Sequence, residues 1–171
     1  IIESVGVLHH MNDPMAGWNV LTNLLKVGGL MRIGLYSDIS RTPIVNVRKN
    51  INPLNSTIND TEILSIREKI ISSDQKMHQQ IKSWRDFYSL SELRDLLFHV
   101  QEHRFTIPKI KDCLSRLGLD FCGFVGPDIT NAFLEKNNQS ALYDLDRWEI
   151  FEKLNPQIFS SMYQFWCQKI A

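Results

Sequence analysis

The sequence predicts an α/β fold, because apolar segments with the composition of β-strands alternate with segments of helical periodicity. Residues 1–36 read as strand, helix and strand, which is the pattern of a parallel crossover unit. Two further strand-like segments lie at 119–125 and 162–168. With 171 residues, of which 43% are hydrophobic, the chain can bury one core.

The first strand is expected over residues 1–8, which are rich in Ile, Val and Leu and have no turn before them. We therefore expect the chain to open inside a domain. Asp13 and Pro14 predict a helix start, and Gly28 ends that helix. Its apolar residues at helical spacing are Trp18, Leu21, Leu24 and Leu25. Residues 30–36 form the second predicted strand.

The middle of the chain predicts helices. Residues 37–82 are polar, with one amphipathic helix in which the apolar positions are Ile63, Ile66, Ile70 and Ile71. Ser89 or Ser91 is expected to cap a helix whose apolar positions are Leu93, Leu96, Leu97 and Val100. A third helix is expected to begin at Thr106 and end at Gly118.

The last third predicts a strand at 119–125, a stop at Gly126-Pro127, a helix over 140–154 and a final strand at 162–168. The expected organisation is thus a strand–helix–strand part (1–36), a helical insertion or lid (37–115) and a part with the last strands (116–171).

Composition narrows the classes of function and the cellular compartment that we expect for this chain. Lys and Arg number 19, as do Asp and Glu, so no net field attracts nucleic acid or an anionic membrane. Three scattered cysteines favour a reducing cytoplasm over a disulfide framework. No apolar run approaches the ~20 residues of a membrane helix.

Two segments then carry a family resemblance. The stretch Val5-Gly6-Val7-Leu8-His9-His10-Met11-Asn12-Asp13-Pro14, followed by Leu24-Leu25-Lys26-Val27-Gly28-Gly29, resembles the fourth strand, helix and fifth strand of class I S-adenosylmethionine-dependent methyltransferases. The family commonly has Pro where Val27 stands. The resemblance implies a partial Rossmann-like sheet in which 119–125 and 162–168 are the sixth and seventh strands, the last one antiparallel.

The helical middle resembles, more loosely, a bacterial subgroup whose methyltransferase domain can follow tetratricopeptide repeats. The Gly-rich cofactor turn of the family does not occur here, since the chain has no Gly-x-Gly. We therefore expect S-adenosylmethionine to bind in a longer parent protein and not to bind the isolated fragment.

His9 and His10 are the candidate catalytic residues, because they follow a predicted parallel strand at the end where α/β sheets bind ligands. A neutral imidazole can take a proton from the attacking acceptor group, and His10 is preferred. The alternative is that one ring packs against the next helix and the other caps the turn. The resemblance implies that His9 and Met11 contact the cofactor.

The stretch from His99 to His103 matches the His-x-x-Glu-His pattern of zinc peptidases, provided that it is helical. A metal site lacks a further ligand here, so we expect no metal. The alternatives are polar residues of a substrate pocket and a solvated or helix-capping pair.

Further substrate-binding candidates follow the second strand or lie in the expected lid. They are Tyr36, Arg41, Asp86 and Tyr88. Asp86 could equally cap the helix that follows it. The large aromatic residues are expected in the core, and they are Trp18, Trp148, Phe151 and Trp166.

The leading hypothesis is that the chain supplies the acceptor side of a methyltransferase. The alternative is a non-catalytic binding or assembly module derived from that fold. The expected acceptor is a small molecule or a protein. We also expect the fragment to form a homodimer through the open edge of its first strand.

Overall fold

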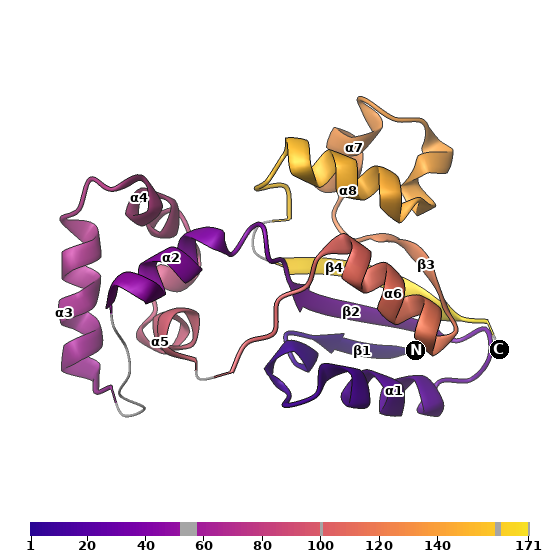
Figure 1. Cartoon of the computed structure of the whole chain (residues 1–171), viewed down its shortest axis with the longest axis horizontal. Coiled ribbons are helices and arrows are strands. Elements are labelled where there is room, and N and C mark those ends of the chain that lie inside the picture. The colour runs from indigo at the N-terminus through magenta and orange to yellow at the C-terminus, as the bar shows by residue number, and fades with distance from the viewer. Residues whose placement is uncertain (52–57, 100, 160–161, 171) are drawn as a thin grey trace. The chain divides into compact units, whose positions relative to one another are not determined.

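A computed structural model describes residues 1–51, 58–99, 101–159 and 162–170. The contacts divide the chain into two compact units. The α/β unit comprises Ile1–Ser40 and Gln101–Ala171, and the helical unit comprises Arg41–Val100. Each unit is described by itself (Figure 1).

The α/β unit contains a four-stranded sheet in the order β1-β2-β4-β3. The strands are β1 (Ile2–Val5), β2 (Leu30–Tyr36), β3 (Leu119–Phe124) and β4 (Met162–Lys169). β1 and β2 are parallel, and α1 (Pro14–Leu24) joins them, which confirms the predicted crossover unit. β4 is antiparallel to both β2 and β3, as the resemblance implied.

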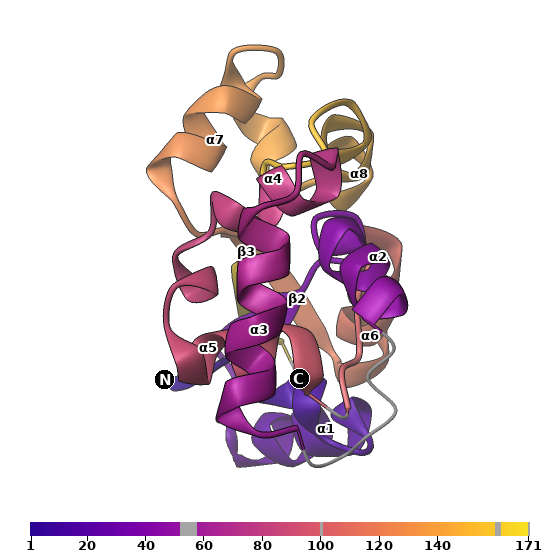
Figure 2. The same cartoon turned by 90° about the vertical axis from the view of Figure 1, so that its left-hand side faces the viewer.

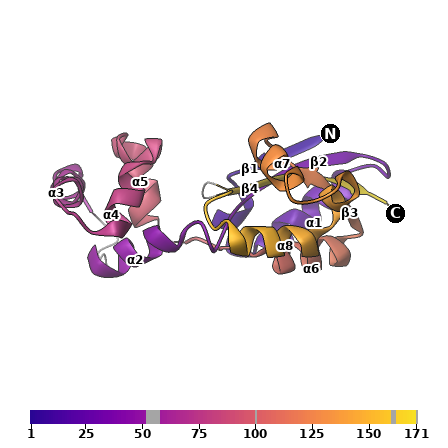
Figure 3. The ribbon, with the colours of Figure 1, turned by 90° about the horizontal axis from the view of Figure 1, so that it is seen from above.

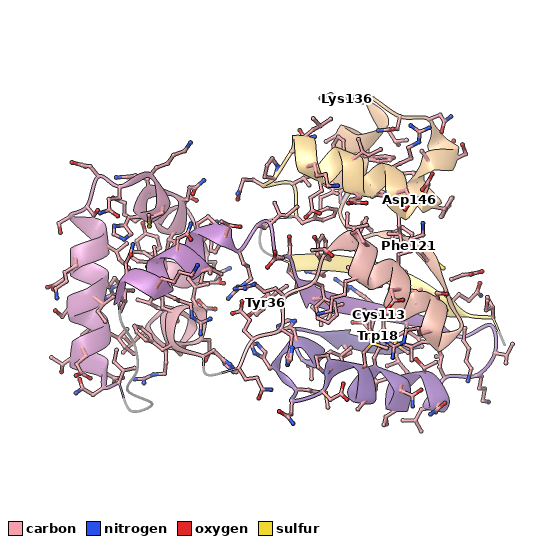
Figure 4. The ribbon with its side chains drawn as sticks, viewed as in Figure 1. Trp18, Tyr36, Cys113, Phe121, Lys136 and Asp146 are labelled. Carbon is pink, nitrogen blue, oxygen red and sulfur yellow. The ribbon has the colours of Figure 1, made fainter. Side chains whose placement is uncertain are left out.

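One face of the sheet carries the core. Met31, Ile33 and Leu35 on β2 are fully buried, and each lies opposite a fully buried residue of β4. Trp18 of α1 packs on Phe165 of β4, with ring centroids 6.1 Å apart. Figure 3 shows α6 (Ile107–Leu117) and α8 (Leu145–Leu154) on the same side of the strands. Trp18 and Cys113, both labelled in Figure 4, belong to this core.

Local signals account for most helix ends. Asp13 accepts hydrogen bonds from the first turn of α1, and Thr106 caps α6 in the same way. Gly118 ends α6 with φ of 64°, a left-handed conformation that favours glycine. Of the apolar residues at helical spacing, Trp18 and Leu25 are buried, whereas Leu24 is exposed.

The segment between β3 and β4 differs from the prediction. Gly126 ends the strand, but Pro127 then begins a helix that the sequence reading missed, α7 (Pro127–Leu134). The expected helix over 140–154 is two elements, a 3₁₀ helix η3 (Gln139–Tyr143) and α8. Asp144 separates them because its carboxylate caps α8 by accepting from Asp146 and Arg147.

The helical unit has a core of its own, formed by short amphipathic helices (Figure 2). They are α2 (Thr42–Ile51), α3 (Asp60–Ile71), α4 (Lys76–Lys82), the 3₁₀ helix η2 (Arg85–Phe87) and α5 (Leu90–Phe98). Ser89 caps α5 as predicted. Val100, the last position expected in that helix, lies outside the described residues.

The compact units also differ from the expected boundaries at 37 and 115. Residues 37–40 and the whole of α6 belong to the α/β unit, because Ile107, Ile110 and Leu114 are part of its core. Across the described residues, the structure has no helix long and apolar enough to cross a membrane.

Candidate active site

The candidate site lies at the carboxyl ends of β1 and β2. Parallel strands end at the same edge of a sheet, which is where open α/β sheets bind their ligands. β1 leads into a 3₁₀ helix, η1 (Leu8–His10), and β2 ends at Tyr36. Figure 4 shows Tyr36 at this end of β2.

Three aromatic rings pack together there. The imidazole of His9 stacks on the Tyr36 ring, with centroids 3.7 Å apart and an interplanar angle of 28°. The ring of His10 meets both edge-on, at 4.4 Å from His9 and 5.4 Å from Tyr36. His9 is fully buried, whereas His10 is only half-buried. Of the two, His10 is therefore the ring that a substrate can reach.

The segment from Gln101 to Phe105, with which the chain re-enters the α/β unit, lies against the ends of these strands. The His103 N–H donates to the carbonyl oxygen of His9 at 2.8 Å, and the Phe105 N–H donates to that of Tyr36 at 2.8 Å. The Arg104 guanidinium pairs with Asp38 at 2.9 Å. The two backbone hydrogen bonds, which do not depend on side-chain identity, thus hold His9 and Tyr36 in place.

The protonation of His10 follows from its partner. Its Nδ1 lies 3.2 Å from the carbonyl oxygen of Gln101. A carbonyl oxygen only accepts hydrogen bonds, so Nδ1 carries the proton and Nε2 is the basic nitrogen of the neutral ring. A histidine that acts as a general base is typically oriented in this way, by a hydrogen bond from its other ring nitrogen.

A buried polar cluster lies beside the end of β2. Glu152 of α8 is 1% exposed. Its Oε1 accepts the hydroxyl hydrogens of Tyr163 at 2.7 Å and Ser37 at 3.0 Å. Burial raises the pKa of the Glu152 carboxyl, although both hydroxyl donors oppose this effect. Burial and the nearby carboxylate likewise raise the pKa of the Tyr163 phenol.

Four of the predicted substrate-binding residues lie in the helical unit, namely Arg41, Asp86, Tyr88 and His99. Arg41 is buried, and the Tyr88 hydroxyl donates to the carbonyl oxygen of Lys82 at 3.0 Å. Asp86 does not cap α5, because that role falls to Ser89. Their role toward a substrate stays a prediction, as does cofactor contact by His9 and Met11.

The helical geometry that the zinc-peptidase pattern requires is not found at His99. α5 ends at Phe98, and His99 has extended backbone with ψ of 128°, so His99 and His103 do not share a helix face. Within the described part of the chain, no three His, Cys, Asp or Glu side chains are grouped to hold a metal ion. The Nε2 of His103 is shielded from solvent and has no hydrogen-bond partner among the described residues.

A cavity of about 310 Å³ lies elsewhere, between α6, β3 and α8. Gly118 and Leu119 line it at the amino end of β3, so it opens at the opposite edge of the sheet from His10. Lys111 at its rim is paired with Asp146 at 2.6 Å. The cavity is therefore distinct from the candidate site.

The sequence reading missed Ser37, Gln101, Glu152 and Tyr163. Glu152 carried a signal, since it occupies the apolar stripe of α8 with Leu145 and Trp148. A charged residue in such a stripe needs partners. Gln101 acts through its backbone carbonyl, for which a sequence offers no signal.

Comparison with known proteins identifies the class of fold. No protein-family model matches the sequence. Two structures of PKMT2 from Rickettsia typhi, one of them in complex with AdoHcy, each cover 98% of this chain with a TM-score of 0.63. Their identities of 11% and 10% establish likeness of fold alone. The chain thus has a methyltransferase-like α/β fold.

A sequence relative comes from Synechococcus sp. (strain ATCC 27144 / PCC 6301 / SAUG 1402/1), where it is described as an uncharacterized protein. It is 26% identical over 171 aligned positions, which cover 92% of this chain and 41% of that protein. The PKMT2 chains are covered to 34% and 35%. The present chain spans well under half the length of each of these proteins.

Proposed function

We propose that this chain supplies the acceptor side of an S-adenosylmethionine-dependent methyltransferase site within a longer protein. The supporting observation is the placement of His10, with its Nδ1 held by a carbonyl, at the carboxyl end of a parallel strand in a methyltransferase-like fold. AdoHcy, which accompanies one of the PKMT2 structures, is what S-adenosylmethionine becomes after it gives up its methyl group.

S-adenosylmethionine, when bound, would supply a methyl group on sulfur for direct displacement by an acceptor lone pair, with the electron pair of the broken carbon–sulfur bond left on sulfur. The Nε2 of His10 takes the proton that the acceptor loses. Tyr36 and the buried His9 hold the His10 ring in place, which keeps its Nε2 aligned for this proton transfer.

The residues present fit only part of the cofactor. The chain lacks a Gly-x-Gly turn, and His9 and Met11 are its candidate contacts. The unpartnered Nε2 of His103 offers a further polar contact near His9 for a bound acceptor or cofactor. The acceptor is a small molecule or a protein, and the balanced charge disfavours nucleic acid. No observation on the described residues favours the non-catalytic alternative.

The test is methyl transfer by the natural protein that contains this sequence, with labelled S-adenosylmethionine and panels of metabolite and protein acceptors. His10→Ala is expected to lower kcat by about 100-fold or more, the usual scale of general-base catalysis, and to leave AdoHcy affinity nearly unchanged. His78→Ala, in the helical unit, is the control. Equal losses of turnover and affinity, or no loss, would contradict the proposed role of His10.

A further inference from the structure

The segment from Tyr36 to Ser40 begins at the last residue of β2 and is held by side chains as well as by backbone. The Ser37 Oγ accepts the N–H of Ser40 at 3.2 Å, and the Ser40 hydroxyl donates to the carbonyl oxygen of Pro156 at 3.2 Å. The Asp38 N–H donates to the carbonyl oxygen of Phe105 at 2.8 Å. Both hydroxyls are fully buried, so solvent cannot replace these bonds.

Glu152 connects this segment to two further elements of the α/β unit. One oxygen, Oε1, receives Ser37 from the segment and Tyr163 from β4. Leu35, next to Tyr36, lies opposite Tyr163 in the sheet register. The carboxyl therefore connects α8, β4 and the residue that directly follows Tyr36.

We propose that Glu152 is a positioning residue, which fixes the Tyr36–Ser40 segment through Ser37 and so holds the Tyr36 ring on the imidazole of His9. Burial of a carboxyl costs free energy unless hydrogen bonds compensate for the lost solvation. For packing alone, an apolar residue of similar volume would be sufficient at this position. The atom that matters is Oε1, because both hydroxyl donors bond to it. This inference does not depend on the reaction that the site carries out.

One conservative replacement of Glu152 retains the hydrogen-bond acceptor that the proposal requires. In Glu152→Gln the amide oxygen can accept both hydroxyl hydrogens, whereas Glu152→Leu removes the acceptor at similar size. Ser37→Ala removes the bond to the segment, and Tyr163→Phe removes only the bond to β4. Glu149→Gln, one turn earlier on α8, breaks an ion pair with Lys153 and is the control.

The measurement is the aromatic NMR spectrum of the chain labelled with ¹³C at histidine. The ring signals of His9 report its stacking on Tyr36, and Tyr36→Leu defines their position without the stack. Glu152→Leu is expected to move these signals toward the Tyr36→Leu position. Glu152→Gln and Glu149→Gln are expected to leave them at the wild-type position.

The proposal fails if Glu152→Leu leaves the His9 signals in place, or if Glu152→Gln moves them as far as Glu152→Leu does. Should Glu152→Leu lose its fold by circular dichroism, the two single-bond variants decide. Ser37→Ala must then shift the His9 signals more than Tyr163→Phe. Equal shifts, or none, would show that the carboxyl serves only to join α8 to β4.

Discussion

The imidazole of His9 lies flat on the phenol ring of Tyr36, with the two ring centroids 3.7 Å apart. His9 lies in η1, which follows β1, and Tyr36 is the last residue of β2, the strand that pairs in parallel with β1. Because β1 and β2 are parallel, the stack lies at the edge of the sheet that is formed by their carboxyl ends. The His10 ring contacts the His9 ring and is therefore held at the same edge.

Tyr36→Leu is expected to destabilise the protein by about 0.5 to 1.5 kcal/mol beyond the loss of buried area, because the ring pair with His9 is lost. Urea unfolding measures the change. Tyr143→Leu is the matched control, since that side chain is 63% exposed. Equal effects of the two substitutions would argue against a contribution from the stack.

Glu152 makes stability depend on pH. Burial raises the pKa of its carboxyl above the ordinary value of 4.5, so in that range the folded protein binds a proton more readily than the unfolded chain. Its contribution is therefore fully present below pH 4.5 and is lost as the pH rises through the raised pKa. Urea midpoints from about pH 4 to about pH 8 are expected to fall less steeply in Glu152→Gln than in the wild type. Glu135→Gln, at the exposed end of α7, should keep the wild-type slope, and a wild-type slope in Glu152→Gln would contradict the assignment.

Trp148 joins α7 and α8 through a stacked contact with Phe133, with ring centroids 3.8 Å apart. Both side chains are almost completely buried. Trp148→Ala is expected to cost about 3 to 5 kcal/mol of unfolding free energy, because the neighbouring elements can only partly fill the cavity. Ile150→Ala, exposed on the same helix, should stay within about 0.5 kcal/mol of the wild type. A Trp148→Ala loss as small as that of Ile150→Ala would mean that α7 rearranges to fill the space.

Local signals in the sequence were sufficient to place the strands along the chain and the helices with strong caps, whereas the antiparallel pairing of β4 came from the family resemblance. Asp13, Ser89, Thr106 and Gly118 each mark an observed helix end. The predicted stop at Gly126-Pro127 is observed, but α7 was missed because Pro both ends strands and starts helices. The helical reading of His99–His103 failed because nothing local shows that α5 ends at Phe98.

The site was predictable only in part, for a physical reason. The placement of His10 follows from its position after a strand, which is local information. The bond between Ser37 and Glu152 joins residues 115 positions apart, and the contact of His10 with Gln101 spans 91 positions. Such contacts depend on the tertiary fold and leave no periodic pattern in the sequence.

The open edge of β1 leads to the last prediction, which concerns self-association. β1 pairs with β2 on one side, and no other described strand pairs with it. The Gly6 N–H donates to the carbonyl oxygen of Gly34. Since neighbouring residues of a strand direct their backbone groups to opposite sides, Glu3 and Val5 present theirs to the open edge.

A second copy of the chain can satisfy these groups in one favourable register. A two-fold axis at Ser4 places Glu3 opposite Val5 of the partner copy, which pairs the outward N–H and C=O groups and avoids facing carboxylates. The same axis brings two α1 helices to one side of the joined sheets, and α1 runs beside β1 (Figure 1). α1 has no charged residue and exposes Val20 and Leu24, a composition that suits the centre of an interface.

We therefore expect the chain to elute as a dimer in size-exclusion chromatography with light scattering at micromolar concentration. Val5→Pro should convert it to a monomer, because Pro removes an N–H that points to the open edge and none that bonds β2. Ile150→Glu, which adds a charge on the exposed face of α8, should leave the dimer intact. A monomeric wild type would show that the β1 edge does not recruit a second copy. A dimer that survives Val5→Pro would place the contact elsewhere, most directly on the apolar face of α1, where Leu24→Glu would then abolish it.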